Sequence, residues 1–404
     1  MVSSATVPSP LPAAFAILHA TVITVSGPVL PDTPVVVENG LISQVGGVVP
    51  SGLPTVDASG QYLMPGLIDL HSHMGVYPWP GGGGSSDGNE AVEPFTPRVY
   101  ARDSFDPEDP AIARARAGGI TTIQVLPGSA NLIGGQAVVL KLRPARTVDA
   151  MSFREAPRAI KMACGENPKR VYGGEKDADA VQTRMGEIAM LRQEFVRATE
   201  YATARAGRTP PPRDLDLEVL ADVIDDKIRV NLHCYRSHDI ADWFRVADEF
   251  GFRIVTIHHA LDTYKVRDLL AAHGTGIATW PDWWGFKQEA FDGLPEGAAL
   301  VSNAGVPVAT HSDSASHVQR LHVEAAKMVR YGMTEADALE SITLDPARLL
   351  GVEGQVGSIE VGKHADLALF DKHPLEGTAR VSRSWIDGRL VFDRAVEGTP
   401  NGRR

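Results

Sequence analysis

The stretch GLIDLHSH at residues 66–73 is the first of a series of short apolar runs that decides the fold. Stretches with the apolar spacing of an amphipathic helix separate several of these runs, for example MGEIAMLRQEFVRATEYATARAG from Met185. Strand-like runs that alternate with helices are typical of βα units and a parallel sheet. The later runs, in chain order, are ITTIQVLP, AIKMA, IRVNLHCY, FRIVTIHH, TGIATW and VPVATHSD, the last of which ends at Asp313.

The length of this alternating region favours one architecture. Residues 65–349 match a (β/α)8 barrel, which needs roughly 250 residues and tolerates insertions. An open, doubly wound sheet is the alternative, but no GxGxxG follows the first run, so a dinucleotide site is not indicated. The sequence therefore predicts an α/β fold with a barrel over residues 65–349.

The two chain ends have a different texture. Residues 14–64 contain AFAILHATVITV and TPVVVENGLISQVG, and the residues after 350 contain GSIEVGKHADLALFD and VSRSWIDGRLVF. These runs are rich in β-branched residues and carry the turn pairs Asn39-Gly40 and Asp387-Gly388. We expect residues 1–64 and 350–404 to build one small β-sandwich together.

The charge and the apolar pattern exclude several kinds of partner. The chain has 404 residues and a formal net charge of −11, so nucleic acid or an anionic membrane would be bound against an unfavourable field. No window reaches the roughly 18 apolar residues of a membrane helix, and no Lys or Arg precedes the proline-interrupted N-terminal run. We expect a small-molecule substrate, no nucleic acid and no membrane, and leave a homo-oligomer open.

The cysteine content indicates the compartment. Cys164 and Cys234 are far apart in the sequence and lie in apolar surroundings, a pattern that indicates neither a disulfide framework nor a CxxC metal site. We therefore expect a cytoplasmic protein in a reducing compartment.

Ligand-type side chains stand at the ends of four of the apolar runs. His71 and His73 are two positions apart, so in a strand they project to the same side, where two imidazoles could hold one metal ion. His233, the pair His258-His259 and Asp313 end later runs. Because the carboxyl ends of barrel strands meet at one mouth, these residues could surround a metal ion together.

The stretch MPGLIDLHSHMG, the histidines at the run ends, THSD and the closing run ITLDPARLLGVEGQVGSIEVGKHADLALFD resemble the amidohydrolase superfamily. The imidazolonepropionase-like and metal-dependent peptidase branch is the most similar. The resemblance covers roughly residues 14–393 and implies a distorted (β/α)8 barrel, a β-sandwich from both chain ends and a metal-dependent hydrolase.

The resemblance also implies a ligand set. His71, His73, His233 and Asp313 match family ligands, and the spacing to DTYKV favours His259 over His258, which we expect to be packed on the other face. The implied cofactors are two divalent metal ions, with zinc favoured and manganese, iron or cobalt open.

A lysine or a glutamate could bridge the two ions. Lys161 stands where related peptidases have a lysine carboxylated by CO2; the alternative is an ion pair with Glu166 or Asp313. Glu166 is the rival bridging ligand, and its own alternative is a loop ion pair with Lys169 or Arg170.

Other residues are weaker candidates for binding substrate. Gln136 follows Gly134-Gly135, for which a tight turn is favoured. The Gly- and Pro-rich residues 75–97 are either a lid or a flexible insertion. The remaining candidates, each with core packing or a surface role as its alternative, are Trp280, Trp283, Trp284, Arg236, His238 and His317.

The reaction follows from the implied metal. Water activated by the metal would attack a carbonyl or amidine carbon, and Asp313 would carry the proton to the leaving nitrogen. The leading hypothesis is hydrolysis of a C–N bond in an amide, a cyclic amide or a dipeptide-like substrate. The alternatives are a mononuclear deaminase or imidazolone-type ring hydrolase, and a non-catalytic binding protein on the same fold.

Overall fold

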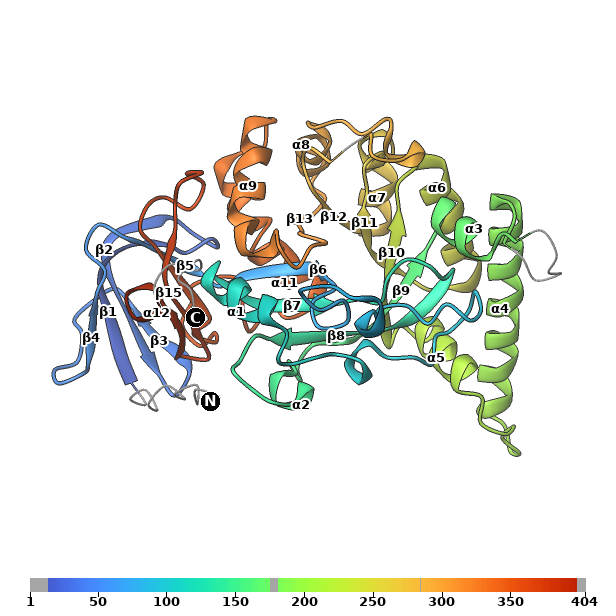
Figure 1. Cartoon of the computed structure of the whole chain (residues 1–404), viewed down its shortest axis with the longest axis horizontal. Coiled ribbons are helices and arrows are strands. Elements are labelled where there is room, and N and C mark those ends of the chain that lie inside the picture. The colour runs from blue at the N-terminus through green and yellow to red at the C-terminus, as the bar shows by residue number, and fades with distance from the viewer. Residues whose placement is uncertain (1–13, 175–180, 284, 398–404) are drawn as a thin grey trace.

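The computed structural model describes residues 14–174, 181–283 and 285–397. Within them the chain forms a β-rich domain from both chain ends and a larger α/β barrel beside it (Figure 1). Residues 1–13, which include part of the proline-interrupted N-terminal run, and Trp284 lie outside the described residues. None of the described helices is both long enough and apolar enough to cross a membrane.

The barrel is an eight-stranded sheet in the described part of the chain, and hydrogen bonds join its strands in sequence order. Each apolar run forms one strand, which confirms the predicted barrel. Strands β6 and β7 are buried along their whole length, as expected for strands that are covered on both faces. The strands are β6 (Leu67–Ser72), β7 (Ile120–Val125), β8 (Ile133–Lys141), β9 (Arg158–Ala163), β10 (Ile228–Cys234), β11 (Ile254–His259), β12 (Gly276–Thr279) and β13 (Val308–Thr310).

Strand β8 runs against the others. It pairs antiparallel with both β7 and β9, and the short loop from β7 to β8 contains no helix. The tight turn expected at Gly134-Gly135 is wrong, because both glycines lie inside β8. A Cβ atom on Gly135 would lie 2.7 Å from the carbonyl oxygen of Val99, so this glycine lets the segment before β8 pack across the strand. The reversed strand distorts the barrel.

Side chains help to close the barrel between its first and last strands. The Asp69 carboxylate on β6 accepts hydrogen bonds from the Ser312 N–H at 3.1 Å and the Ser312 hydroxyl at 2.5 Å. The Asp313 N–H donates to the His71 carbonyl at 3.2 Å. These bonds hold the end of β6 beside the residues that follow β13.

Helices cover the outside of the barrel (Figure 1). Local signals fix their ends: the Thr183 side chain caps α4, the Asp214 side chain caps α5, and Gly251 ends α6 at a φ of 75°. The described helices are α1 (Pro110–Ala117), α2 (Val148–Met151), α3 (Glu166–Tyr172), α4 (Arg184–Arg205), α5 (Leu215–Ile224), α6 (Ser237–Phe250), α7 (Arg267–His273), α8 (Gly297–Ser302), α9 (Leu321–Arg330), α10 (Glu335–Glu340), α11 (Leu344–Leu350) and α12 (Arg394–Glu397).

The two chain ends form the second domain together, as predicted. Its strands hydrogen-bond in the order β16-β15-β14-β5-β1-β2-β3, and β4 pairs with β1. Phe15 of β1 stacks on Trp385 of β15 at 6.1 Å within a separate apolar core. Both turn pairs join hairpin strands. The strands are β1 (Ala14–Ile23), β2 (Val29–Glu38), β3 (Leu41–Val45), β4 (Thr55–Asp57), β5 (Tyr62–Pro65), β14 (Leu367–Phe370), β15 (Val381–Ile386) and β16 (Arg389–Asp393).

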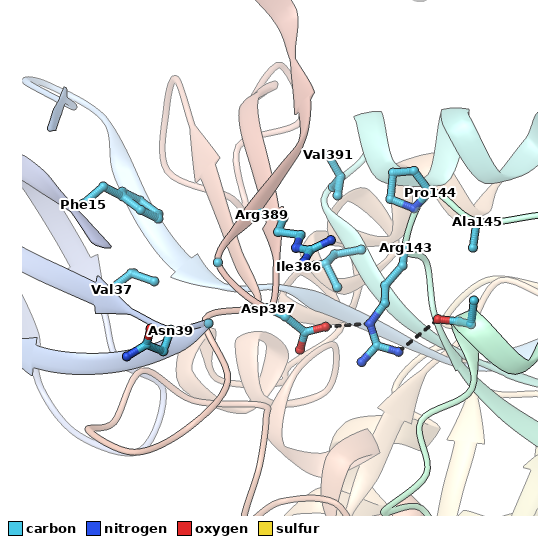
Figure 2. A pocket seen from close by; sticks show the side chains of 13 residues that line it. Phe15, Val37, Asn39, Arg143, Pro144, Ala145, Ile386, Asp387, Arg389 and Val391 are labelled. Atoms are coloured by element: carbon cyan, nitrogen blue, oxygen red, sulfur yellow. Dashed lines mark hydrogen bonds and ion pairs between the residues drawn. The ribbon is translucent and has the colours of Figure 1, made fainter. Parts of the chain in front are cut away.

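A buried charge cluster joins the two domains. Lys141 of β8 is fully buried, and its ammonium lies 2.5 Å from the Asp387 carboxylate and 3.0 Å from that of Asp366. Arg143 also reaches Asp387, at the wall of a cavity of about 750 Å³ (Figure 2). A buried ammonium needs such partners, so this pairing holds the β-domain against β8.

Candidate metal centre

The carboxyl ends of the barrel strands bring the predicted histidines together. His71, His233 and His259 are almost fully buried there, whereas the side chains of His73 and Asp313 are 17% and 28% exposed. The strand order explains the convergence, since β6 and β13 are the two ends of one sheet and β10 and β11 are parallel neighbours with His233 opposite His258. The site thus has a buried inner part and a more accessible outer part.

The outer part consists of His71, His73 and Asp313. The Nε2 atoms of the two histidines are 3.1 Å apart. The Asp313 Oδ1 atom lies 3.2 Å from His73 Nε2 and 3.5 Å from His71 Nε2. Three potential ligand atoms therefore face one another at the distances that a shared metal ion requires.

Hydrogen bonds indicate which nitrogen carries the proton on each ring. His73 Nδ1 lies 2.8 Å from the Leu126 carbonyl oxygen, which can only accept, so Nδ1 donates and Nε2 keeps its lone pair. His258 Nε2 donates its proton to the Asn231 amide oxygen at 2.9 Å. The other ring nitrogen, His258 Nδ1, is then an acceptor and receives a hydrogen bond from His71 Nδ1 at 3.0 Å. His71 Nε2 is left unprotonated. Both Nε2 lone pairs and an Asp313 oxygen thus meet, which is a donor set for a cation.

Burial keeps the inner histidines neutral. It lowers the pKa of His71, His233, His258 and His259 well below the ordinary value. Burial alone would raise the pKa of Asp313, but the contact with His73 and the positive charge that His73, His311 and Lys161 can carry outweigh it and lower that pKa. Neutral imidazoles beside an ionised carboxylate are the protonation states that bind a divalent metal ion.

The inner part contains a histidine that the sequence interpretation missed. One ligand atom each of His71, His259 and His311 lies within 4.8 Å of the others. His311 stands two residues before Asp313, the same spacing as His71 and His73, and that repetition was the available signal.

The expected orientation of His258 is wrong. Although this side chain is buried and hydrogen-bonded, it faces the cluster and contacts His71. The reason is the backbone at the end of β11, where His259 and Ala260 have positive φ values of 71° and 56°. That rare conformation turns two adjacent histidines toward one centre, and strained residues of this kind gather at functional sites.

Lys161 lies on β9, opposite Asn231 and two residues before the strand end, and His233 lies next to the last residue of β10. Among the described residues the only hydrogen-bond partner of the Lys161 ammonium is the Pro127 carbonyl oxygen at 3.4 Å, so neither expected ion pair forms. Burial lowers the pKa of Lys161 to about 7. His233 Nε2 lies 3.2 Å from the Asn167 amide, and its ring is 4.4 Å from that of His259.

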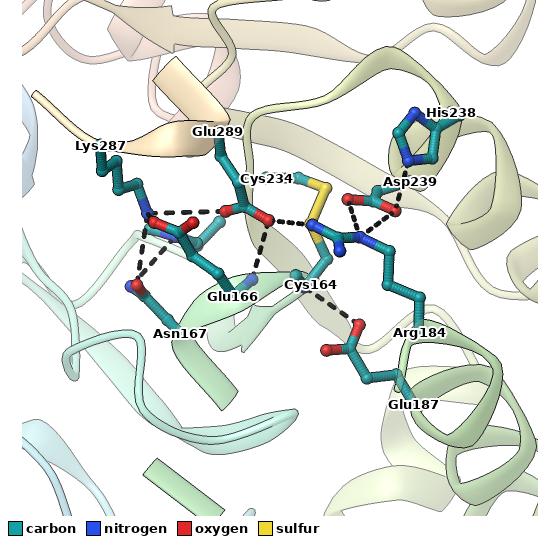
Figure 3. The surroundings of a disulfide bond; sticks show 12 residues. Cys164, Glu166, Asn167, Arg184, Glu187, Cys234, His238, Asp239, Lys287 and Glu289 are labelled. Carbon is teal, nitrogen blue, oxygen red and sulfur yellow. Dashed lines mark hydrogen bonds and ion pairs between the residues drawn. A yellow bond between two sulfur atoms is a disulfide. The ribbon is translucent and has the colours of Figure 1, made fainter. Parts of the chain in front are cut away.

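Glu166 does not join either ligand group. It begins α3, its carboxylate pairs with the Lys287 ammonium at 3.3 Å, and its side chain is 31% exposed (Figure 3). The partner is therefore Lys287, and not Lys169 or Arg170 as expected. The same lysine lies 4.0 Å from the centre of the Tyr235 ring.

A disulfide joins Cys164 and Cys234, so the expectation of unpaired cysteines is wrong (Figure 3). The two residues are 70 positions apart in sequence, but β9 and β10 pair with Ala163 opposite His233. The next residue on each strand is a cysteine, and the two Cα atoms are 5.3 Å apart. Strand register, which sequence separation does not reveal, creates this bond beside His233.

We expect the purified, unfolded and unreduced protein to show no reactive thiol. Replacing both cysteines by alanine should lower the free energy of unfolding by about 2–4 kcal/mol, because the crosslink restricts the unfolded chain. Thiol titration and denaturant unfolding measure these two outcomes. Two reactive thiols in unreduced wild-type protein would show that the bond does not form.

Only some of the residues predicted to bind substrate lie near the histidine cluster. Trp280 packs on His259 and His311 at ring distances of 4.8 and 4.3 Å, so it walls the cluster. Trp283 lies between Trp280 and His317, with ring distances of 5.3 and 5.1 Å. Tyr235, which the sequence interpretation did not select, stacks on His259 at 5.1 Å. Aromatic rings therefore cover this side of the cluster.

Three other candidates, Gln136, Arg236 and His238, belong to neither ligand group. Gln136 on β8 accepts a hydrogen bond from Arg158 at the amino end of β9, away from the strand ends that carry the ligands. Arg236 precedes α6 and is part-exposed. His238, also named above, is exposed and pairs with Asp239.

The Gly- and Pro-rich segment after β6 is tied to the barrel mouth. The Asn131 amide donates to the carbonyl oxygens of Glu90 and Glu93 at 2.9 Å each. The Tyr77 ring lies 5.5 Å from that of His73, so the segment covers the outer part of the site.

Comparisons with known proteins agree with this architecture. The model of the family described as "Amidohydrolase family" matches residues 62–391. Amidohydrolase tasK of Hapsidospora irregularis is 35% identical over 394 residues, which are 90% of this chain but only 40% of that protein. An imidazolonepropionase of Cupriavidus pinatubonensis is 25% identical over 84% of this chain and 83% of its own length. The crystal structure of an amidohydrolase from Thermotoga maritima MSB8 is 38% identical, with a TM-score of 0.88 over 94% of this chain and 100% of that chain.

Proposed function

The chain belongs to the amidohydrolase family and is a hydrolytic enzyme acting on C–N bonds, and we propose that it is metal-dependent and cleaves an amide, a cyclic amide or a dipeptide-like substrate. The observation that carries this proposal is the outer group, in which His71 Nε2, His73 Nε2 and Asp313 Oδ1 lie within 3.5 Å of one another. Three acceptor atoms in contact repel one another unless a cation lies among them. Membership of this family of hydrolases also argues against the alternative of a non-catalytic binding protein.

The residues present fit two divalent metal ions, with zinc favoured. His71, His73 and Asp313 would hold one ion, and Lys161, His233 and His259 would contribute to the pair. Four buried nitrogens support this fit, since Nδ1 of His233, Nδ1 of His259 and both ring nitrogens of His311 lack hydrogen-bond partners among the described residues. When bound, such ions polarise a carbonyl group and make water more acidic.

The protein side chains would do the remaining chemistry. Asp313, ionised and partly exposed, would accept a proton from the attacking water and deliver it to the leaving nitrogen. Trp280 and Tyr235 would keep bulk water away from the inner histidines, because both rings are packed on His259 and are buried.

Lys161 would serve as a carbamate that bridges the ions. Its lowered pKa leaves much of the amine neutral near pH 7, and a neutral amine can form an N–C bond with CO2 as it releases a proton. Lys161→Ala should therefore lose about one metal ion per chain, and short carboxylic acids with bicarbonate should restore part of it. Elemental analysis measures this loss.

The matched comparison is Glu166→Gln, which should keep both ions because Glu166 pairs with Lys287. Loss of one ion from Glu166→Gln, with normal metal content in Lys161→Ala, would give the bridging role to Glu166. A crystal structure that shows an unmodified Lys161 amine between two ions would contradict the carbamate.

A mononuclear deaminase or imidazolone-type ring hydrolase is the second candidate, favoured by the similarity to an imidazolonepropionase. Metal stoichiometry separates the two: two ions per chain support the first proposal, and one supports the second. The test combines metal analysis with a turnover screen of N-acyl amino acids, dipeptides, and cyclic ureides or lactams. We also propose a cytoplasmic location; because a disulfide is rare there, the thiol titration bears on it.

A further inference from the structure

We propose that His311 is a further metal ligand, which forms with His71 and His259 an inner triad of imidazoles beneath the outer group. The family resemblance gave His311 no role. The proposal rests on the metal dependence proposed above and concerns one additional residue toward that metal. It is carried by strand geometry and by the absence, among the described residues, of a hydrogen-bond partner for either His311 ring nitrogen.

The geometry pairs two adjacent strand ends. The His311 N–H donates to the Thr279 carbonyl at 3.1 Å, so the ladder between β12 and β13 continues as far as His311. On the other side, bonds from Ser312 and Asp313 hold this segment against β6. His311 lies beside His71, with the two rings stacked, and Asp313 lies beside His73, with Oδ1 3.2 Å from Nε2.

Ring positions agree with this layered arrangement. The His71 and His311 rings stack with centroids 4.9 Å apart and planes 18° apart. The His259 ring is 4.9 Å from His71 and 5.3 Å from His311. The three residues are at most 2% exposed, whereas His73 and Asp313 reach solvent. The inner triad therefore meets the outer group at His71, whose Nε2 lone pair would serve one ion, and His311 would be a further ligand of that ion.

Hydrogen bonding separates His311 from the other buried histidines. His258 has a partner on each ring nitrogen, namely His71 and Asn231, so its ring is held without a metal. Neither nitrogen of His311 has a hydrogen-bond partner among the described residues, although both are buried. An imidazole with two unpartnered nitrogens is costly in a dry interior, and binding a cation would satisfy one of them.

The test replaces His311 by phenylalanine, which keeps a ring against His71 and Trp280 but removes both nitrogens. Cobalt and zinc are titrated separately into the metal-free full chain against a chromophoric chelator, and X-ray absorption counts the imidazoles per bound ion. We expect the affinity for one metal equivalent to fall by more than the roughly 10–100-fold that loss of an outer hydrogen-bond partner costs. The imidazole count should fall as well.

The chain offers a matched control in His322. This histidine is also buried, also has an unpartnered Nδ1, and packs on Phe370 at 5.4 Å, away from both ligand groups. His322→Phe should therefore leave metal affinity and imidazole count at the wild-type values. If His311→Phe does not fold, His311→Asn, which retains a donor atom, should fold and bind with intermediate affinity.

The titration separates failure of the His311 proposal from failure of the proposed metal dependence. Wild-type protein that binds neither cobalt nor zinc would overturn metal dependence itself. Wild-type protein that binds metal, with His311→Phe or His311→Asn unchanged in affinity and imidazole count, would overturn only the role of His311.

Discussion

Removal of metal from the purified enzyme should abolish hydrolysis, and zinc, manganese, iron or cobalt salts should restore it. The physical reason is the outer group: without a cation, two imidazole lone pairs and a carboxylate oxygen meet at 3.1 to 3.5 Å. Without an ion these side chains could still accept a proton from water, but they would neither polarise a carbonyl group strongly nor lower the pKa of a bound water. Elemental analysis and turnover, measured before and after prolonged chelation, check this prediction.

The control shows that the metal-free chain remains folded. Circular dichroism should be unchanged on chelation, because the barrel is closed by Asp69 and Ser312 and crosslinked by Cys164 and Cys234, all independent of the ion. Full activity in a sample shown to contain no metal would contradict metal dependence. Lost activity that no metal restores, in a still folded sample, would also count against it.

The apolar runs predicted most of the barrel because each run is long enough to be one buried strand. β8 was missed for a physical reason: Gly134-Gly135 has the composition of a turn, and only contact with Val99 shows why glycine is needed within a strand. The β-domain was predictable from both chain ends, since Asn39-Gly40 and Asp387-Gly388 adopt the positive φ values of tight hairpins.

The spacing of the histidines and their positions at strand ends were enough to predict most of the candidate ligands. The two-residue spacing of His71 and His73 predicts a shared side, and the structure brings both beside Asp313. What spacing cannot give is strand register and backbone conformation. The Cys164–Cys234 bond depends on the register of β9 with β10, and the inward turn of His258 depends on the positive φ of His259.

Replacing Asp313 by asparagine should lower kcat by about 10²–10⁴-fold, the loss expected for a general acid–base group. Asparagine keeps the size of the side chain and a carbonyl oxygen for the metal, but it cannot accept the proton. It also tolerates the backbone, since Asp313 has a φ of 48° and asparagine is among the residues that adopt such values most readily. The substitution therefore isolates the proton transfer.

Metal content should fall less in Asp313→Asn than in His71→Ala or His73→Ala, because each histidine variant loses a ligand nitrogen entirely. If Asp313 only capped the following helix, its replacement would cost about 1 kcal/mol of stability and leave kcat near the wild-type value. The structure favours the first outcome, since the Asp313 carboxylate lies 3.2 Å from His73 Nε2. Asp69→Asn is the matched control: its carboxylate bonds to Ser312 in closing the barrel, so its loss should lower stability and leave little specific effect on kcat of the folded fraction. Near-normal turnover by metal-reconstituted Asp313→Asn would show that another group carries the proton.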